Sequence, residues 1–278
     1  MRIEKTKQSM NAILEEKRTE GTIGFVPTMG ALHEGHLSLV QRSVKENNYT
    51  VVSIFVNPTQ FNNSNDLETY PRTLEADIAL LEAAGCDMVF APEVKEMYPE
   101  PDQRSFDFGD LETVMEGEMR PGHFNGVGQV VSKLFDYVRP HRAYFGMKDF
   151  QQVAIIQKLV ALLELSVEIV SCDIIREDDG LAKSSRNTLL TPEHRLEAPN
   201  IYKALLEAVK FSRELTVKET IQKTIDKINE SSLLEVEYFS IVNNRTLQPI
   251  KKWEEAENAV GCIAVQAGAV RLIDNIVF

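Results

Sequence analysis

The apolar run at residues 50–56, TVVSIFV, restricts the possible folds of this chain more than any other segment. Nearly all of its side chains are apolar and several are β-branched, so a strand here needs cover on both faces. The stretch before it, residues 22–44, reads as a short strand, a glycine-bearing turn and an apolar-periodic helix. A strand, a helix and a second buried strand in this order predict a parallel sheet covered by helices.

The same alternation continues to residue 172. Helical spacing predicts helices at 5–17, 37–44, 74–84, 124–138 and 148–163. Strands are predicted at 22–26, 50–56, 88–90, 142–145 and 167–172, with a minor strand at 105–108 and a loop over 57–72.

The pattern changes from Asp173 onward. A charged connection at 174–187 is followed by helices at 200–215 and 217–229, and then by strands at 236–242, 259–266 and 270–273. We therefore predict an α/β domain over residues 1–173 and a smaller α+β domain over residues 174–278.

Composition limits the function classes. A net charge of −12 argues against non-specific nucleic-acid binding, which needs a basic face. The three cysteines, at 86, 172 and 262, form no Cys-x-x-Cys motif, so neither a disulfide framework nor a thiolate zinc site is expected. No apolar signal region follows Met1 and no stretch of about 18 uncharged apolar residues occurs, so we expect a soluble, cytoplasmic protein with no membrane partner.

Two histidines lie in the stretch 24–40, GFVPTMGALHEGHLSLV. A strand, a glycine turn and a helix N-terminus form a usual cradle for a nucleotide phosphate, because backbone N–H groups and the helix dipole favour anions. His33 and His36, three residues apart at the helix start, are expected to face the same bound group, with Gly35 leaving room between them. Surface histidines near a helix cap are the alternative interpretation; a zinc site would need a third ligand that the spacing does not supply.

Other chemistry-bearing residues lie near predicted strand ends. Lys148, in a strand-to-helix junction, is expected at the carboxyl edge of the sheet, where open α/β sheets bind ligands. Residues 183–186, Lys-Ser-Ser-Arg, suit a mobile phosphate clamp, although a solvated linker has the same composition. Gln60 and Gln152 could fix a small substrate with hydroxyl and carboxylate groups, or be ordinary exposed amides.

Six motifs occur together and in order: PTMGALHEGH, FVNPTQF, YPRT, RPGHFNGV, YFGMKDFQQ and DGLAKSSRN. This set resembles the pantoate–β-alanine ligase family of the nucleotidylyltransferase superfamily, closely through residue 187 and more loosely beyond. The resemblance implies a Rossmann-like N-terminal domain, a C-terminal lid domain and a homodimer. It also implies condensation of (R)-pantoate with β-alanine, in which ATP becomes AMP and pyrophosphate through a pantoyl adenylate.

The resemblance further implies roles for individual residues. His36 would be the proton donor and His33 its partner at the phosphates, with Lys148 and Arg186 as the other catalytic groups. Gln60 and Asn57 would line the acceptor site, and Gln152 would hold pantoate. ATP would be bound by residues in four segments: Met29, Gly30, Ala31, Leu32, His33, Glu34, Gly35 and His36; Gly146, Met147, Lys148 and Asp149; Ile175; and Lys183, Ser184, Ser185 and Arg186.

The chain departs from the family pattern in places. Met147 stands where relatives often have a charged residue, and Lys183 where they have an apolar one. Some relatives hold magnesium with an acidic pair and a glutamine after YPRT, but the matching positions here are Ala76, Asp77 and Leu80. We therefore expect no protein-held metal, and Mg²⁺ carried in by ATP.

Two other classes share part of this pattern. A different nucleotidylyltransferase, or a fragment of a class I aminoacyl-tRNA synthetase, could carry His-x-Gly-His, but the acidic balance and the lack of an evident RNA-binding appendage count against the synthetase. A non-catalytic nucleotide-binding module would need only the first turn, and would not use a distal cation loop or paired amides.

Overall fold

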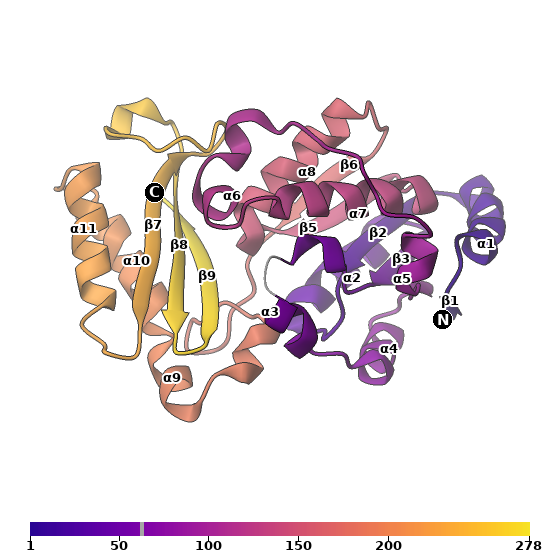
Figure 1. Cartoon of the computed structure of the whole chain (residues 1–278), viewed down its shortest axis with the longest axis horizontal. Helices are drawn as coiled ribbons and strands as arrows, with labels where there is room; N and C mark the ends of the chain where they lie inside the picture. The colour runs from indigo at the N-terminus through magenta and orange to yellow at the C-terminus, as the bar shows by residue number, and fades with distance from the viewer. Residues whose placement is uncertain (62–63) are drawn as a thin grey trace. The chain divides into compact units, whose positions relative to one another are not determined.

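The computed structural model describes residues 1–61 and 64–278 (Figure 1). These residues form two compact units, each described separately below. The first contains Met1–Phe108, Arg120–Met147 and Gln152–Asp173, and the second contains Gly109–Met119, Lys148–Gln151 and Ile174–Phe278.

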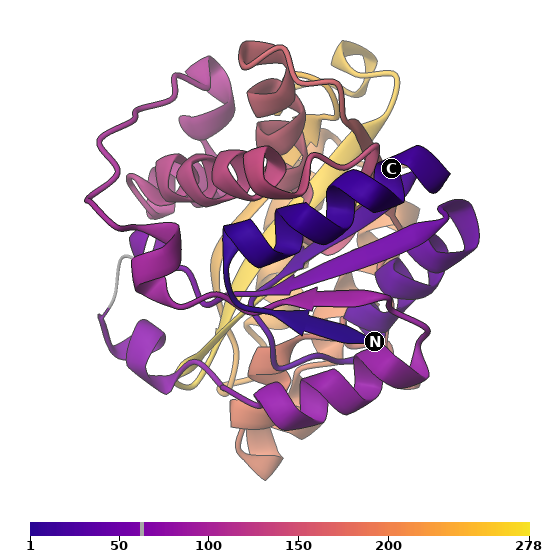
Figure 2. The same ribbon diagram turned by 90° about the vertical axis from the view of Figure 1, so that its right-hand side faces the viewer.

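A six-stranded parallel sheet forms the centre of the first unit (Figure 2). Its order is β1-β4-β3-β2-β5-β6, so the chain moves outward from β2 in one direction through β3 and β4, and in the other through β5 and β6. The strand order therefore reverses between β2 and β5. The strands are β1 (Arg2–Glu4), β2 (Ile23–Thr28), β3 (Tyr49–Ile54), β4 (Met88–Phe90), β5 (Arg142–Gly146) and β6 (Glu168–Cys172).

Helices cover both faces of this sheet. The helices of this unit are α1 (Lys7–Glu20), α2 (Glu34–Glu46), α3 (Ser64–Thr69), α4 (Leu74–Ala83), α5 (Val94–Met97), α7 (His123–Val138) and α8 (Phe150–Leu162), whose first two residues belong to the second unit; a 3-10 turn, η1, spans Pro58–Gln60. On one face, Val26, Val52 and Tyr144 of three neighbouring strands pack with Leu39 and Val40 of α2. All five side chains are at most 7% exposed, as the apolar strand sequences predict.

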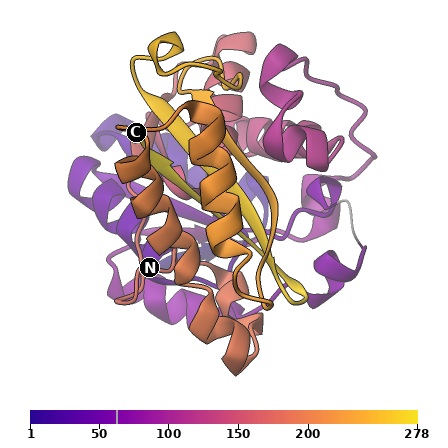
Figure 3. The same ribbon diagram turned by 90° about the vertical axis from the view of Figure 1, so that its left-hand side faces the viewer.

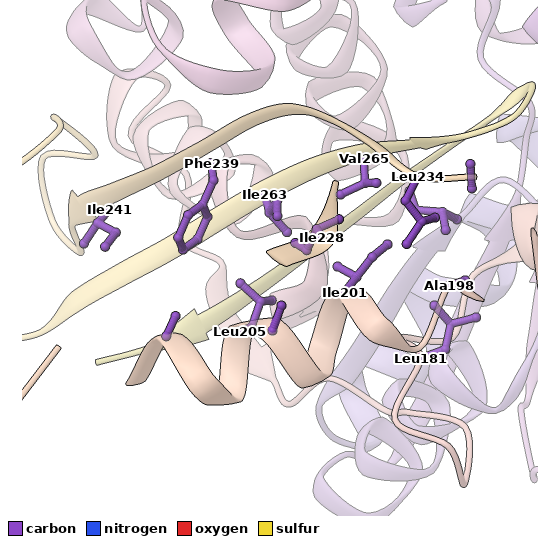
Figure 4. Close-up of a cluster of buried hydrophobic side chains, with 14 of the residues drawn as sticks. Leu181, Ala198, Ile201, Leu205, Ile228, Leu234, Phe239, Ile241, Ile263 and Val265 are labelled. Carbon is purple, nitrogen blue, oxygen red and sulfur yellow. The ribbon is translucent and has the colours of Figure 1, made fainter. Parts of the chain in front are cut away.

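The second unit has a three-stranded antiparallel sheet in the order β7-β8-β9. In Figure 3, helices α10 and α11 lie side by side over one face of this sheet. Side chains from both layers, among them Ile201, Leu205, Ile228, Phe239 and Ile263, form its buried core (Figure 4). The elements are α6 (Met115–Met119), α9 (Pro192–Glu197), α10 (Asn200–Phe211), α11 (Val217–Ile228), β7 (Glu235–Asn243), β8 (Ala259–Ala267) and β9 (Val270–Val277), with 3-10 turns η2 (Gly109–Glu112), η4 (Ser185–Leu189) and η5 (Trp253–Glu255).

The predicted fold class, a Rossmann-like parallel sheet followed by a smaller α+β part, is confirmed. Every major predicted strand and helix is present, with bounds that differ by a few residues. In the described part of the chain, no helix is both long and apolar enough to cross a bilayer.

Two local predictions were wrong. The segment 105–108 is not a strand: the Phe106 N–H donates to the Asn125 side chain, and Gln129 donates to the carbonyls of Asp102 and Arg104. Side chains of α7 thus satisfy the backbone groups that a neighbouring strand would otherwise have paired. The predicted loop at 57–72 contains η1 and α3, and its residues 62 and 63 lie outside the described ones.

Candidate active site

The carboxyl ends of β2 and β5 lie side by side, because these two parallel strands are hydrogen-bonded neighbours. This is the point where the strand order reverses, and ligands of open α/β sheets bind outside such points. The turn after β2 leads into His33 and α2, and β5 ends at Gly146. Beyond its chain neighbours, no described atom lies within 4 Å of the place where a Cβ on Gly146 would stand, so this strand end has open space beside it.

The turn between β2 and α2 is held by a buried carboxylate. Gly30 and Ala31 both have positive φ, +84° and 51°, so consecutive backbone N–H groups face the same way. The N–H groups of Ala31 and Leu32 donate to the two carboxylate oxygens of Asp77, at 2.9 and 2.8 Å. Asp77 is only 1% exposed and also accepts from the Thr73 hydroxyl. These two amides, which the sequence assigned to a phosphate, therefore bind an anion of the protein itself.

The histidines form a reciprocal cap at the start of α2. His33 is the N-cap residue, and its Nδ1 accepts from the Gly35 N–H at 3.1 Å, while His36 Nδ1 accepts from the His33 N–H at 3.4 Å. The two rings lie 4.1 Å apart between centroids. Because each Nδ1 accepts a hydrogen bond, each neutral ring carries its proton on Nε2. The cap uses only the Nδ1 atoms, so the capping interpretation and a binding interpretation that uses Nε2 are compatible.

Gln60 lies in η1, within reach of the same turn. Its Nε2 is 3.4 Å from the sulfur of Met29, and its Oε1 accepts from Asn57 Nδ2 at 3.0 Å. Its backbone carbonyl is 2.8 Å from Nδ1 of His123, in the RPGHFNGV motif. The structure thus places Asn57 and Gln60, predicted for the acceptor site, next to Met29, predicted for the ATP segment.

The predicted residues at 146–152 divide between the two units. Gly146, Met147 and Gln152 belong to the first, and Gln152 is half-buried in the first turn of α8. Lys148 and Asp149 belong to the second, in the 3-10 turn η3 (Met147–Asp149). Lys148 Nζ is 3.7 Å from the Asp149 carboxylate, and its carbonyl accepts from Asn275 of β9.

The predicted connection at 174–187, which contains the clamp residues 183–186, forms a hairpin and a turn in the second unit. Arg176 and Ala182 form a β-bridge, and the Lys183 N–H donates to the carbonyl of Ile175. The Lys183 ammonium pairs with Glu177 at 2.8 Å. Ser184 caps η4, which begins at Ser185, and accepts from the Arg186 N–H. The interpretation as a solvated linker is therefore not supported.

The part of the chain that the structure describes contains no candidate ligand set for a metal ion. Among residues 1–61 and 64–278, no group of three or more His, Cys, Asp and Glu side chains could hold a metal ion. The carboxylate at the one acidic position matching the family's magnesium ligands, Asp77, is committed to Ala31 and Leu32. Ala76 and Leu80 carry no ligand atoms.

Three residues around this site had no role in the sequence interpretation. Asp77 was considered only as a metal ligand. Tyr98, whose hydroxyl is 2.8 Å from Asn57 Oδ1, received no role at all. His123 lies in a quoted motif to which no function was given. Their partners are 45, 41 and 63 residues away in the chain, so no local spacing could have indicated them.

These features define a nucleotide-binding α/β enzyme of the His-x-Gly-His type. The model of the family described as pantoate-beta-alanine ligase matches residues 2–277. The chain therefore belongs to the pantoate–β-alanine ligase family, and it is a ligase.

Named relatives agree with this assignment. A pantothenate synthetase of Bacteroides fragilis is 55% identical over 277 residues, covering 99% of this chain and 98% of that protein. The crystal structure of pantothenate synthetase from Thermus thermophilus matches with a TM-score of 0.93 at 43% identity, over 99% of both chains. The Francisella tularensis pantoate-beta-alanine ligase, described as complexed with beta-gamma ATP and beta-alanine, matches with a TM-score of 0.86 at 36% identity, covering 99% of this chain and 97% of that one.

Proposed function

We propose that this ligase works through a pantoyl adenylate. The overall reaction is the ATP-dependent condensation of (R)-pantoate with β-alanine to pantothenate, AMP and pyrophosphate. In the first step a pantoate carboxylate oxygen attacks the α-phosphorus of ATP, and pyrophosphate leaves. In the second, the β-alanine amine attacks the acyl carbon, AMP leaves and the amine loses a proton. The observation that carries this proposal is the histidine pair after β2, in which both Nδ1 atoms accept, so that both Nε2 atoms carry the proton.

The first unit supplies hydrogen-bond donors for ATP and for pantoate. His36 and His33 donate from Nε2 to phosphate oxygens as charge moves onto the departing pyrophosphate. The segment 29–36 lies against the nucleotide, while Gln60 and Gln152 bind pantoate oxygens. Positioning of this kind converts a reaction of separate molecules into an effectively unimolecular step.

The second unit supplies cations. Lys148 and Arg186 neutralise phosphate charge, helped by Lys183, Ser184 and Ser185, and Ile175 lies beside the adenine. We propose a functional division into domains at 1–173 and 174–278, in which the second domain acts as a lid that keeps water from the adenylate.

Three further features belong to the proposal. Mg²⁺ enters as a complex with ATP, since the described residues offer no ligand set for it. The protein is a homodimer, and it works in the cytoplasm on pantoate, β-alanine and ATP, without nucleic-acid or membrane partners.

The experiment that tests the adenylate is exchange of labelled pyrophosphate into ATP, with pantoate present and β-alanine absent. Exchange that depends on pantoate is expected, because pyrophosphate must leave reversibly before the amine reacts. Absence of exchange, with ADP and phosphate as products instead, would overturn the adenylate route.

A histidine substitution tests the site assignment. His36→Ala should reduce exchange by about 10²–10³, the usual cost of one donor aimed at developing charge. His194→Ala is the matched control, because His194 lies half-buried at the start of α9 in the second unit and has no proposed role. Near-normal exchange in His36→Ala would remove that residue from the mechanism.

A further inference from the structure

Asn57 is a buried amide whose hydrogen-bonding capacity is fully used inside the protein. It is 1% exposed and lies directly before η1. Its Nδ2 donates to Gln60 Oε1 at 3.0 Å and to the Gly126 carbonyl at 3.2 Å. Its Oδ1 is 2.8 Å from the Tyr98 hydroxyl and accepts from the N–H and hydroxyl of Thr59. Both N–H groups and the carbonyl oxygen of this amide are thus engaged, and none is left for a ligand.

Backbone groups determine which way this amide points. The Thr59 N–H can only donate, so the atom facing it is the Asn57 oxygen. The Gly126 carbonyl can only accept, so the atom facing it is the Asn57 nitrogen. Burial raises the pKa of Tyr98, which keeps the phenol protonated and able to donate to that oxygen. The orientation of Asn57 therefore follows from obligate donors and acceptors.

The orientation of the Asn57 amide determines the orientation of the Gln60 amide. Because Asn57 presents a donor, Gln60 must present its oxygen to it, and the Gln60 nitrogen then points away. That nitrogen has the Met29 sulfur as its neighbour at 3.4 Å, and a thioether is a weak acceptor that a carboxylate or hydroxyl oxygen displaces readily.

We propose that Asn57 and Tyr98 are positioning residues that act on pantoate only through Gln60. They hold the Gln60 amide with its NH₂ toward the substrate, so the group that binds there must be a hydrogen-bond acceptor. The inference rests on the proposed role of Gln60 in binding pantoate. It removes Asn57 from the direct contacts of the substrate.

The RPGHFNGV motif holds the backbone of the same turn. His123 Nδ1 contacts the Gln60 carbonyl at 2.8 Å. A Cβ on Gly126 would lie 2.3 Å from the Thr59 carbonyl oxygen, so only glycine allows α7 to approach η1 this closely. The motif thus fixes the backbone of Gln60, while Asn57 and Tyr98 orient its side chain.

A double-mutant cycle tests the proposal. Asn57→Asp keeps the size and the acceptor for Tyr98 but removes the donor to Gln60, whose amide should then turn its nitrogen inward and its oxygen toward pantoate. The KM for pantoate should rise about tenfold or more, with the KM for ATP unchanged. In a Gln60→Ala background the same substitution should change the pantoate KM less than about twofold, because its route to the substrate is gone.

A second double-mutant cycle, with Tyr98→Phe, is used if Asn57→Asp does not fold. Circular dichroism and thermal melting show whether it folds. Tyr98→Phe should raise the pantoate KM less than Asn57→Asp, since Thr59 and Gly126 still orient the amide, and this rise too should vanish in Gln60→Ala. An equal effect of either substitution in both backgrounds would overturn the positioning role. An unchanged pantoate KM in Gln60→Ala alone would instead overturn the proposed site, so the two failures are distinguishable.

Discussion

Two buried aspartates hold two parts of this protein by different means. Asp77, 1% exposed, holds the turn before His33 and is bound by neutral groups: two backbone N–H groups and the Thr73 hydroxyl. Asp274, 5% exposed, holds the hairpin at 176–182 and is bound by both terminal nitrogens of Arg176, at 2.6 and 2.9 Å. Residue type and burial are alike, and only the partners differ.

The difference matters for what each region can present to a ligand. Asp77 needs no counter-ion, because its partners are fixed dipoles and it lies in the first turn of α4, where the helix dipole favours an anion. The conformation of the turn and the charge of Asp77 therefore stabilise each other. Asp274 and Arg176 are both desolvated when the protein folds. Burial raises the pKa of Asp274, although the positive charge of Arg176 acts to lower it. Neutral dipoles thus hold the turn that leads into the histidines, and an ion pair holds the hairpin next to the cations proposed to bind phosphate.

The largest expected effect is that of Asp274→Asn. It leaves the Arg176 guanidinium, 17% exposed, without its carboxylate, while its other contacts, the Gly180 and Asn275 carbonyls and the Tyr202 ring, carry no charge. Breaking a buried ion pair from one side typically costs about 3–5 kcal/mol, so thermal melting should show a large loss of stability.

Asp179→Asn is the matched control for that loss. The partner of Asp179, Arg195, is 36% exposed, and such pairs are worth about 0–1 kcal/mol. Its melting temperature should therefore stay close to that of the wild type. Equal losses in the two variants would contradict the distinction between buried and exposed pairs.

Asp77→Asn should have an intermediate effect on stability and a clear effect on activity. Asparagine can accept from only one of the two N–H groups and turns its own NH₂ toward the other. One unsatisfied buried amide costs about 1–3 kcal/mol, and the distorted turn should slow pyrophosphate exchange. Thr73→Val, which removes one hydroxyl and keeps both amide contacts, should change exchange less. Unaltered exchange in Asp77→Asn would show that the turn does not need its carboxylate.

The sequence predicted the sheet because its strands are continuous apolar runs, which only a covered sheet accommodates. It failed at 105–108 because Phe106 and Phe108 alternate with polar residues as in a strand, whereas the Phe106 N–H and the Arg104 carbonyl bond to side chains of α7. Short polar α3 gave no periodic signal at all.

The sequence predicted the candidate site less completely than it predicted the sheet. Motifs located His33, His36 and Gln60, whose placement follows from local strand, turn and helix signals. They could not separate residues that bind from residues that position, because Asp77 and Tyr98 reach their partners through the fold, 45 and 41 residues away in sequence. That distinction depends on which donors and acceptors are already satisfied.

Asp102 has both a neutral partner, the Arg104 N–H, and a charged one, the Arg104 guanidinium. Its contribution to stability should be the smallest of those of Asp77, Asp274 and Asp102, and it should disappear in acid. The Arg104 guanidinium and the Arg104 N–H hold the pKa of its carboxyl at about 2, below the ordinary value of 3.8. A depressed carboxyl pKa adds stability that is present above about pH 4 and is lost as the pH falls through about 2. Since Arg104 is 45% exposed, water screens the pair and the contribution is on the order of 1 kcal/mol. The melting temperatures of the wild type and Asp102→Asn should therefore differ at about pH 5 and converge toward about pH 2, and a difference that stays constant over this range would assign the effect to packing rather than charge.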